Sequence, residues 1–360
     1  MKPLISFILP IYNTDELVLR SCLDCLTGFT SSQFEFILID DGSQAYVKAV
    51  VEDYCQKDSR FIYLYQVNAG VSSARNSGLT HAHAEWVFFI DSDDLLTKNA
   101  EAILLESIKK FENSEVVLFN YGEINSQTGK VSEAKDPITI DSVYWQDLDA
   151  EELLLAVFRT PETGGNYSGY YLGMPWAKLV KREILNKNAL RFPDDITKRE
   201  DALFAVQLYS SQPKVSYVAD VVYLYKTDNT DSLSKKYDPE LPVMFVKLLN
   251  RLSSFQKAVR NKEAFNDSFS IYCFDLTKEL VNLCYCNQNN SATYQERRQA
   301  FLNFRKREEL VTYFTYIPKF NGPIWKKVLF KAIQQESFIF LNGIYIVRKA
   351  QNILRKRESK

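Results

Sequence analysis

The sequence predicts an α/β fold, with a mostly parallel sheet flanked by helices over residues 1–228 and a helical C-terminal region over residues 238–360. Two observations indicate this. Short apolar runs alternate with amphipathic segments in the first part of the chain, which is typical of right-handed strand–helix–strand units with parallel strands. From about residue 238 onward the pattern is helical and rich in aromatic residues, which favours a second, all-helical domain.

Five short apolar runs near the start of the chain have the length and composition of buried strands. They are LISFILPIY, FEFILID, RFIYLYQ, EWVFFID and SEVVLFNYGE. The segments between them are predicted to be helical, namely TDELVLRSCLDCLTG, AYVKAVVEDYCQK, a loop entering a helix at GVSSARNSGLTHAHA, and residues 98–112.

The middle of the chain is less regular. Residues 124–170 are polar and contain Gly and Tyr, which suggests an insertion or a mobile region over a crevice. The segments that follow are predicted to be a helix at PWAKLVKREILNKN, a second helix at REDALFAVQLYSS and a strand at KVSYVADVVYLYK.

The composition argues against several function classes. The chain has 44 Lys and Arg against 45 Asp and Glu, so its net charge does not indicate a nucleic-acid binder. The six cysteines are scattered and form no disulfide framework or zinc pattern, which favours a reducing compartment. The start, MKPLISFILPIYNTDE, is interpreted as a strand rather than a signal peptide, and no apolar run is long enough to span a bilayer.

Polar residues stand directly at the ends of three predicted strands. Tyr12 and Asn13 follow the first strand, Asp40 and Asp41 lie at the end of the second, and DSDD, residues 91–94, follows the fourth. In open α/β sheets, ligands bind beyond the carboxyl ends of the strands. The three ends are therefore expected to converge on one ligand-binding crevice.

The carboxylates of DSDD suit a divalent cation. Mg²⁺ and Mn²⁺ prefer carboxylate oxygens and often share them with substrate phosphates, so Asp91 and Asp93 are candidate metal ligands. The alternative is an acidic helix N-terminus, which the helix dipole favours. Asp94 could have only this second role, at the start of the next helix.

Further residues suit a bound diphosphate nucleotide. The guanidinium of Arg75, in GVSSARNSG, can pair with phosphate oxygens, although an ordinary surface salt bridge is an equal alternative. Gly42 makes IDDGS a tight turn whose carboxylates can accept a hydrogen bond from a base such as uracil, or can stabilise the turn itself. Neither GxGxxG nor GxxxxGK[ST] occurs at the required place, which weighs against dinucleotide and P-loop sites.

A carboxylate in the second half of this part could act as a base. Asp201 stands at a helix start, after RFPDDITKRE, and could take a proton from an incoming hydroxyl if it faces the same crevice. The alternative is a charge that complements the helix dipole.

Six ordered motifs resemble a known family. ISFILPIYN, FILIDDGS, NAGVSSARNSGL, WVFFIDSDD, PWAKL and REDALF have the order and spacing of the family 2 glycosyltransferases, whose GT-A fold is Rossmann-like. The enzymes of bacterial capsule, cell-wall and other surface polysaccharide synthesis are the most similar in style. The resemblance covers residues 3–226 and does not include the C-terminal third.

The resemblance implies a nucleotide-sugar donor, with uridine as the expected nucleoside, a Mn²⁺ or Mg²⁺ ion, and transfer with inversion. It places the nucleotide-sugar half at residues 1–123. Carried over by position, the donor-side residues are Pro10 and Tyr12 in the nucleoside pocket, Asp40 and Asp41 at the base, Arg75 near the nucleotide, and Asp91 and Asp93 at ribose and metal.

The acceptor half, by the same resemblance, is residues 124–228. In REDALF, Asp201 would be the catalytic base and Glu200 its neighbour. Trp176 and Lys178, from PWAKL, would lie near the sugar or the acceptor, which is a glycan or a lipid-linked molecule in such enzymes. The expected place of action is the cytoplasm, at the inner face of the plasma membrane.

The C-terminal segment mixes Trp, Phe, Ile and Leu with Lys and Arg. A basic amphipathic helix can lie in a membrane interface, and the alternative is a helix pair over residues 320–347 that packs on the rest of the chain.

Two other functions compete with sugar transfer. One is a phosphohydrolase of the haloacid dehalogenase type. That type has the pattern DxDx[TV] after its first strand, whereas here DSDD follows the fourth strand and Leu95 comes next. The other is a non-catalytic, glycosyltransferase-like subunit that binds nucleotide or assists assembly.

Overall fold

A computed structural model describes residues 2–125, 128–132, 144–159, 169–227, 237–316, 318 and 324–347. The chain divides into two compact units. Unit 1 comprises Met1–Val157 and Asn166–Thr230, and unit 2 comprises Phe158–Gly165 and Asp231–Lys360. The division near residue 230 lies in the interval that separates the two predicted domains, while the assignment of residues 158–165 to unit 2 has no counterpart in the sequence pattern.

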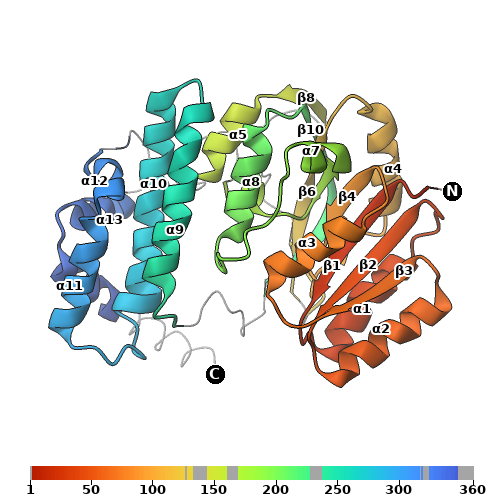
Figure 1. The fold of residues 1–360 in the computed structure, drawn as a ribbon, viewed down its shortest axis with the longest axis horizontal. Coiled ribbons are helices and arrows are strands. Elements are labelled where there is room, and N and C mark those ends of the chain that lie inside the picture. The colour runs from red at the N-terminus through yellow and green to blue at the C-terminus, as the bar shows by residue number, and fades with distance from the viewer. Residues whose placement is uncertain are drawn as a thin grey trace. The chain divides into compact units, whose positions relative to one another are not determined.

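Unit 1 is built on a mixed sheet that has ten strands within the described residues (Figure 1). The order is β3-β2-β1-β4-β9-β6-β10-β5, with β7 beside β6 and β8 beside β10. The strands are β1 (Ile5–Ile11), β2 (Phe34–Asp41), β3 (Phe61–Gln66), β4 (Trp86–Phe89), β5 (Leu95–Leu96), β6 (Val116–Ile124), β7 (Val131–Ser132), β8 (Tyr144–Leu148), β9 (Lys178–Lys181) and β10 (Val215–Lys226). The longer pairings, β1 with β2 and β4, β2 with β3, and β6 with β10, are parallel. The predicted α/β fold with a central sheet and flanking helices is confirmed.

The segment PWAKLVKREILNKN differs from its predicted helix. Residues Lys178–Lys181 form strand β9, which runs antiparallel between β4 and β6, and only Arg182–Lys187 are helical, as α7. The prediction of one continuous helix was wrong because short apolar runs carry no period that separates a strand from a buried helix. Here the open edges of two neighbouring strands decide the conformation.

The helices of unit 1 pack on the sheet and on one another. They are α1 (Glu16–Thr27), α2 (Ala45–Lys57), α3 (Val71–His81), α4 (Ala100–Lys110), α5 (Ala150–Val157), α6 (Gly169–Gly173), α7 and α8 (Glu200–Ser210). α3 packs closely on β1 and β2. A Cβ atom at Gly78 would lie 2.4 Å from a methyl carbon of Ile8 and 2.9 Å from one of Ile39, so only glycine allows this approach.

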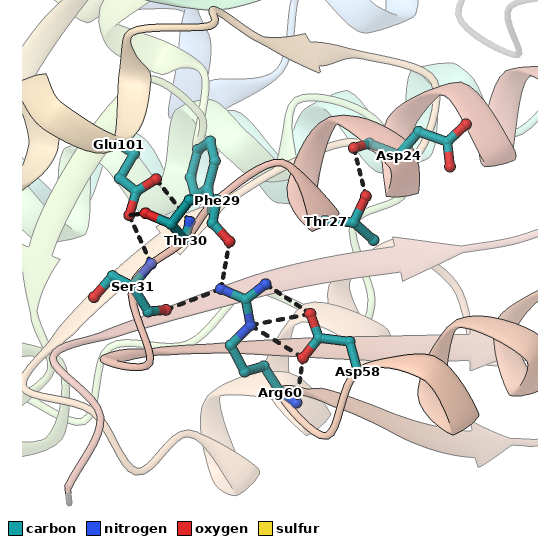
Figure 2. Close-up of polar contacts among 8 residues, drawn as sticks. All are labelled: Asp24, Thr27, Phe29, Thr30, Ser31, Asp58, Arg60 and Glu101. Atoms are coloured by element: carbon teal, nitrogen blue, oxygen red, sulfur yellow. Dashed lines mark hydrogen bonds and ion pairs between the residues drawn. The ribbon is translucent and has the colours of Figure 1, made fainter.

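An ion pair clamps the loop between α1 and β2. Arg60 pairs with Asp58 at 2.6 Å and donates to the carbonyl oxygens of Phe29 and Ser31, at 2.7 and 2.9 Å (Figure 2). Glu101 accepts hydrogen bonds from the backbone N–H groups of Thr30 and Ser31 on the other side of this loop (Figure 2). The loop is thus held by Arg60, which directly precedes β3, and by Glu101 of α4, close to the start of β2.

The core of unit 1 is aromatic and aliphatic. Phe7 of β1 contacts Phe36 of β2 and Phe88 of β4 at ring-centroid distances of 5.3 and 5.5 Å. All seven residues of β1 and all eight of β2 are buried. Strands that are buried throughout read as continuous apolar runs, which is why these elements were predictable.

The segment predicted to be an insertion, residues 124–170, is described only in part. β7, β8, α5 and the start of α6 belong to it, and the remainder lies outside the described residues. Leu153 and Leu154 of α5 are buried, and α5 packs on α8 within unit 1.

Unit 2 is helical, as predicted. Its helices are α9 (Leu241–Ser254), η3 (Phe255–Ala258), α10 (Lys262–Leu280), the π-helical turn η4 (Val281–Tyr285), α11 (Tyr294–Arg305), α12 (Glu308–Thr315), α13 (Ile324–Gln334) and a last helix over residues 338–347. Phe158 contacts Phe265 and Phe269 of α10, which explains why residues after α5 belong to this unit. In the described part of the chain, no helix is both long and apolar enough to cross a membrane.

Candidate active site

Three loops at the carboxyl ends of β1, β2 and β4 are hydrogen-bonded to one another. Asn13 accepts from the backbone N–H of Gln44 at 2.9 Å, and its own N–H donates to the hydroxyl of Ser43. Thr14 and Ser92 share a hydroxyl–hydroxyl hydrogen bond of 2.6 Å. The polar residues that follow three separate strands therefore form one connected rim, as open parallel sheets lead us to expect.

The two carboxylates at the end of β2 are buried and hydrogen-bonded. Asp40 accepts from the backbone N–H of Ser43 at 2.8 Å and from the Tyr63 hydroxyl at 2.9 Å, so it stabilises its own turn. Asp41 accepts from the backbone N–H groups of Ala69 and Gly70, at 2.8 and 2.9 Å. Asp41 thus holds the loop that leads into α3. Gly42 permits the turn, since its φ is +73° and a Cβ there would lie 2.7 Å from a backbone nitrogen.

Pro10 and Tyr12, the two residues predicted to line the nucleoside pocket, differ in exposure. Pro10 is a buried residue of β1, paired with Ile39 of β2. Tyr12 follows the strand end and keeps 52% of its surface exposed. An aromatic ring that stands exposed at this edge of the sheet is available to a flat ligand such as a base.

Arg75 connects the DSDD sequence to α8. Its guanidinium pairs with Asp91 at 2.9 Å and with Glu200 at 3.2 Å, and it lies 5.1 Å from the ring centroid of Phe192. Burial lowers the pKa of this guanidinium, but Asp91 and Glu200 outweigh burial and the pKa of Arg75 is raised. Within the described residues, a positive group near the DSDD carboxylates is therefore provided by the protein itself.

The start of α8 holds two buried carboxylates in succession. Burial, followed by the neighbouring charge of Asp201, raises the pKa of Glu200 to about 7 in spite of Arg75. Burial also raises the pKa of Asp201, against the opposing effect of Arg199. One Asp201 oxygen accepts from the backbone N–H of Ala202 at 2.7 Å, so this side chain is anchored at the helix start. A carboxylate whose pKa is raised is a better proton acceptor than an ordinary one.

Asp94 does not start the next helix, so its interpretation as a helix-start residue was wrong. It is followed by β5, and α4 begins only at Ala100. Asp94 is 1% exposed, and its two oxygens accept from the Tyr223 hydroxyl at 2.6 Å and from the backbone N–H of Lys226 at 2.8 Å. Burial, with Asp91 and Asp93 nearby, raises the pKa of Asp94 well above its ordinary value.

Tyr223 of β10 supports the DSDD loop. Its hydroxyl donates to Asp94 and accepts from the backbone N–H of Asp91 at 3.2 Å. The ring of Trp176 stacks on Tyr223, with 4.7 Å between centroids and 5° between planes. Tyr223 was not among the predicted site residues, because nothing in the strand sequence VVYLYK distinguishes a tyrosine that supports a loop from one that packs in the core.

Trp176 and Lys178 are both buried in the core of unit 1. Trp176 is 1% exposed and lies among Tyr121, Tyr223 and Tyr225. The Lys178 ammonium donates to the carbonyl oxygens of Tyr171, Met174 and Trp176, at 2.9, 2.5 and 3.4 Å. Burial lowers the pKa of Lys178 to about 7. These positions place Trp176 behind the DSDD loop and make Lys178 an anchor of the chain between α6 and β9.

Asp91 and Asp93 suit a divalent cation that also binds oxygen atoms of a ligand. Asp91 keeps 30% of its side chain exposed and Asp93 is half-buried, so both carboxylates reach the surface of the loop. Within the described residues, no group of three or more His, Cys, Asp and Glu side chains could hold a metal ion. Two carboxylates leave most of an oxygen shell to other donors, and the phosphates of a bound nucleotide are donors that Mg²⁺ accepts.

Comparison with known proteins adds sequence relatives. The family model described as Glycosyl transferase family 2 matches residues 6–171. The chain is 29% identical to EpsH of Bacillus subtilis over 241 residues, which are 66% of this chain and 65% of EpsH, so it spans slightly under two thirds of that relative. It is 28% identical to Glycosyltransferase GlyG of Streptococcus pneumoniae over 246 residues, 66% of this chain and 75% of GlyG.

For a third relative, the structure has been determined. Over 225 residues, 62% of this chain and 35% of the relative, the chain is 26% identical to the Poly(ribitol-phosphate) beta-N-acetylglucosaminyltransferase TarS of Staphylococcus aureus. The structure of TarS 1-349 in complex with UDP-GlcNAc matches with a TM-score of 0.66 at 17% identity, over 97% of this chain and 92% of that one. The family match, the relatives and the shared fold agree: residues 6–171 match the family 2 glycosyltransferases, and the fold is similar to that of TarS 1-349, as expected for the predicted GT-A fold.

Proposed function

We propose that the protein transfers a sugar, with inversion, from a UDP-sugar to a hydroxyl group of a glycan or lipid-linked acceptor in surface polysaccharide synthesis. The observation that carries this proposal is the double ion pair of Arg75. It joins Asp91, from the DSDD loop, to Glu200, the neighbour of Asp201. A donor-binding motif and a candidate base are therefore adjacent, as a single displacement requires.

The donor side uses the rim of the sheet. Tyr12 offers an exposed ring for the base, and Asp41 shapes the loop beside it through two backbone hydrogen bonds. Asp91 and Asp93 would hold Mn²⁺ or Mg²⁺ together with the diphosphate. When bound, the ion would neutralise charge on the departing nucleoside diphosphate. Arg75 is the protein's own cation at the same place, and it keeps Asp91 oriented.

The acceptor side uses the start of α8. In the proposed step, the acceptor oxygen forms a bond to the anomeric carbon as the bond from that carbon to the diphosphate oxygen breaks. The acceptor's proton moves to the carboxylate of Asp201, and the nucleoside diphosphate leaves with the bonding electrons. Burial raises the pKa of Asp201, which strengthens it as a base. The hydrogen bond to Ala202 holds that carboxylate in a fixed orientation.

The relatives support the choice of donor and acceptor class. TarS is named for transfer of N-acetylglucosamine to poly(ribitol-phosphate), and its solved complexes contain UDP and UDP-GlcNAc. We therefore propose a UDP-linked sugar and a surface polymer or its precursor for this chain. The proposed place of action is the cytoplasm, at the inner face of the plasma membrane. All six cysteines are free thiols, which agrees with a reducing compartment.

Direct assay of transfer tests the proposal. A panel of nucleotide sugars is incubated with the protein and Mn²⁺ or Mg²⁺, and donor consumption is followed by mass spectrometry with and without candidate acceptors. We expect one UDP-sugar to be consumed and Asp201→Asn to bind that donor with unchanged affinity but without turnover. Turnover in Asp201→Asn would refute the assignment of the base. UDP binding without transfer from any donor would favour the non-catalytic, glycosyltransferase-like subunit.

A further inference from the structure

Helix α13 of unit 2 is apolar on two opposite sides. Leu329, Phe330 and Ile333 point into the unit and are buried, with Phe330 stacked on Phe274 of α10. On the other side, the apolar side chains remain in solvent: Ile324 is 80%, Trp325 46% and Val328 45% exposed. A helix that packs on one protein surface needs only one apolar stripe. The outer stripe of α13 is therefore not explained by the packing of unit 2.

The helix over residues 338–347 repeats this arrangement. Its inner side chains are buried, and Phe338 contacts Tyr294 and Phe301 of α11. Its outer side exposes four large apolar residues at spacings of one and seven: Ile339 (75%), Phe340 (43%), Ile346 (58%) and Val347 (57%). Residues seven apart lie on the same side of a helix, so this is a second ordered stripe rather than scattered exposure.

The charges around these stripes are positive. Lys327 and Lys331 are exposed on the outer side of α13, whereas Glu336 is half-buried and pairs with Lys306. In the sequence after residue 347, RKAQNILRKRESK contains six Lys and Arg against one Glu. A second copy of this chain would bring two such basic segments together, and their repulsion opposes self-association. An anionic lipid surface accepts the apolar side chains and attracts the lysines and arginines.

We infer that the outer stripes of α13 and of the helix over residues 338–347 dock on an anionic lipid surface, in a peripheral manner. Trp325 suits the boundary between headgroups and acyl chains, where amphipathic rings concentrate. Ile339 and Ile346 would enter the acyl region while the lysines remain among the headgroups. This inference does not depend on the proposed transfer reaction, because it uses only unit 2 residues and its test measures no catalysis.

Flotation of the full chain on vesicles tests the inference. The vesicles contain phosphatidylcholine alone or phosphatidylcholine with about 30 mol % phosphatidylglycerol, which gives the vesicle surface a negative charge. We expect binding to the anionic vesicles to exceed binding to the neutral ones about tenfold, and to fall as salt rises. The double variant Trp325→Glu/Ile339→Glu should lose this binding at least tenfold.

A matched variant and a second measurement separate the outcomes. Val243→Glu, on α9 of the same unit, alters a side chain that is 52% exposed but outside the stripes, and it should float like the unchanged protein. Circular dichroism should show equal helix content in all variants. Absence of flotation of the unchanged chain, or an equal loss in Val243→Glu, would overturn the inference. If sedimentation shows that the unchanged chain is a dimer and that the double variant is a monomer, the stripes are a self-association surface. That result would also overturn the inference.

Discussion

Replacing Glu200 by Gln is expected to stabilise the ligand-free protein at high pH and to leave it almost unchanged at low pH. The Glu200 side chain is 13% exposed, and its pKa is raised to about 7 by burial and by Asp201. A carboxyl group with a raised folded-state pKa stabilises the fold fully below its unfolded pKa, and this contribution is lost as the pH rises through the folded pKa. For Glu200 the window runs from the ordinary value of 4.5 to about 7.

The magnitude follows from the width of that window. A window of 2.5 pKa units, from 7 minus 4.5, corresponds to about 3–4 kcal/mol at about 1.4 kcal/mol per unit, and the part below pH 4.5 is outside the range compared. Gln cannot ionise, but its side-chain oxygen can still accept from Arg75. The free energy of unfolding of Glu200→Gln relative to the unchanged protein should therefore rise by about 3 kcal/mol between pH 4.5 and pH 8.

Urea unfolding at pH 4.5 and at pH 8, at one ionic strength and without nucleotide or metal, measures this difference. Glu106→Gln, at an exposed position on α4, is the matched control and should show the same difference from the unchanged protein at both pH values. If the difference for Glu200→Gln stays constant within about 1 kcal/mol, the ion pair with Arg75 fully offsets burial and the reasoning about Glu200 is refuted.

Three further predictions concern the DSDD loop and the packing of the sheet. Asp93→Ala should abolish metal-dependent binding of the donor in calorimetry, and unchanged binding would remove Asp93 from the proposed metal site. Tyr223→Phe deletes the hydroxyl between Asp94 and the backbone of Asp91, which should lower the free energy of unfolding by about 1–3 kcal/mol in urea titrations; an effect below about 0.5 kcal/mol would mean that water replaces the hydroxyl. Gly78→Ala forces a methyl group against two isoleucines and should cost about 1–3 kcal/mol or more, visible as a lower thermal midpoint, whereas an unchanged midpoint would show that α3 can shift at no cost.

Local sequence patterns were sufficient for the elements that are buried throughout. β1, β2 and β4 are predominantly apolar, with only Ser6 and Glu35 interrupting the first two before their carboxyl ends. The polar residues that end these strands were predicted to meet because parallel strands share one carboxyl edge. Strand β9 was missed for a related reason. Its four residues have too short a run for a period, and its conformation depends on pairing with β4 and β6.

The sequence by itself determined most of the longer elements, their order along the chain and the resemblance to the family 2 glycosyltransferases, because apolar periods and ordered motifs are local properties. Tertiary structure decided what each charged residue does. Asp91 and Asp94 stand three positions apart, yet the first pairs with Arg75 and the second is buried against Tyr223, 129 residues away in the chain. Arg75 meets Glu200 across 125 residues. Burial and charge pairing depend on which distant side chains the fold brings within a few ångströms, and one local stretch of sequence does not contain that information.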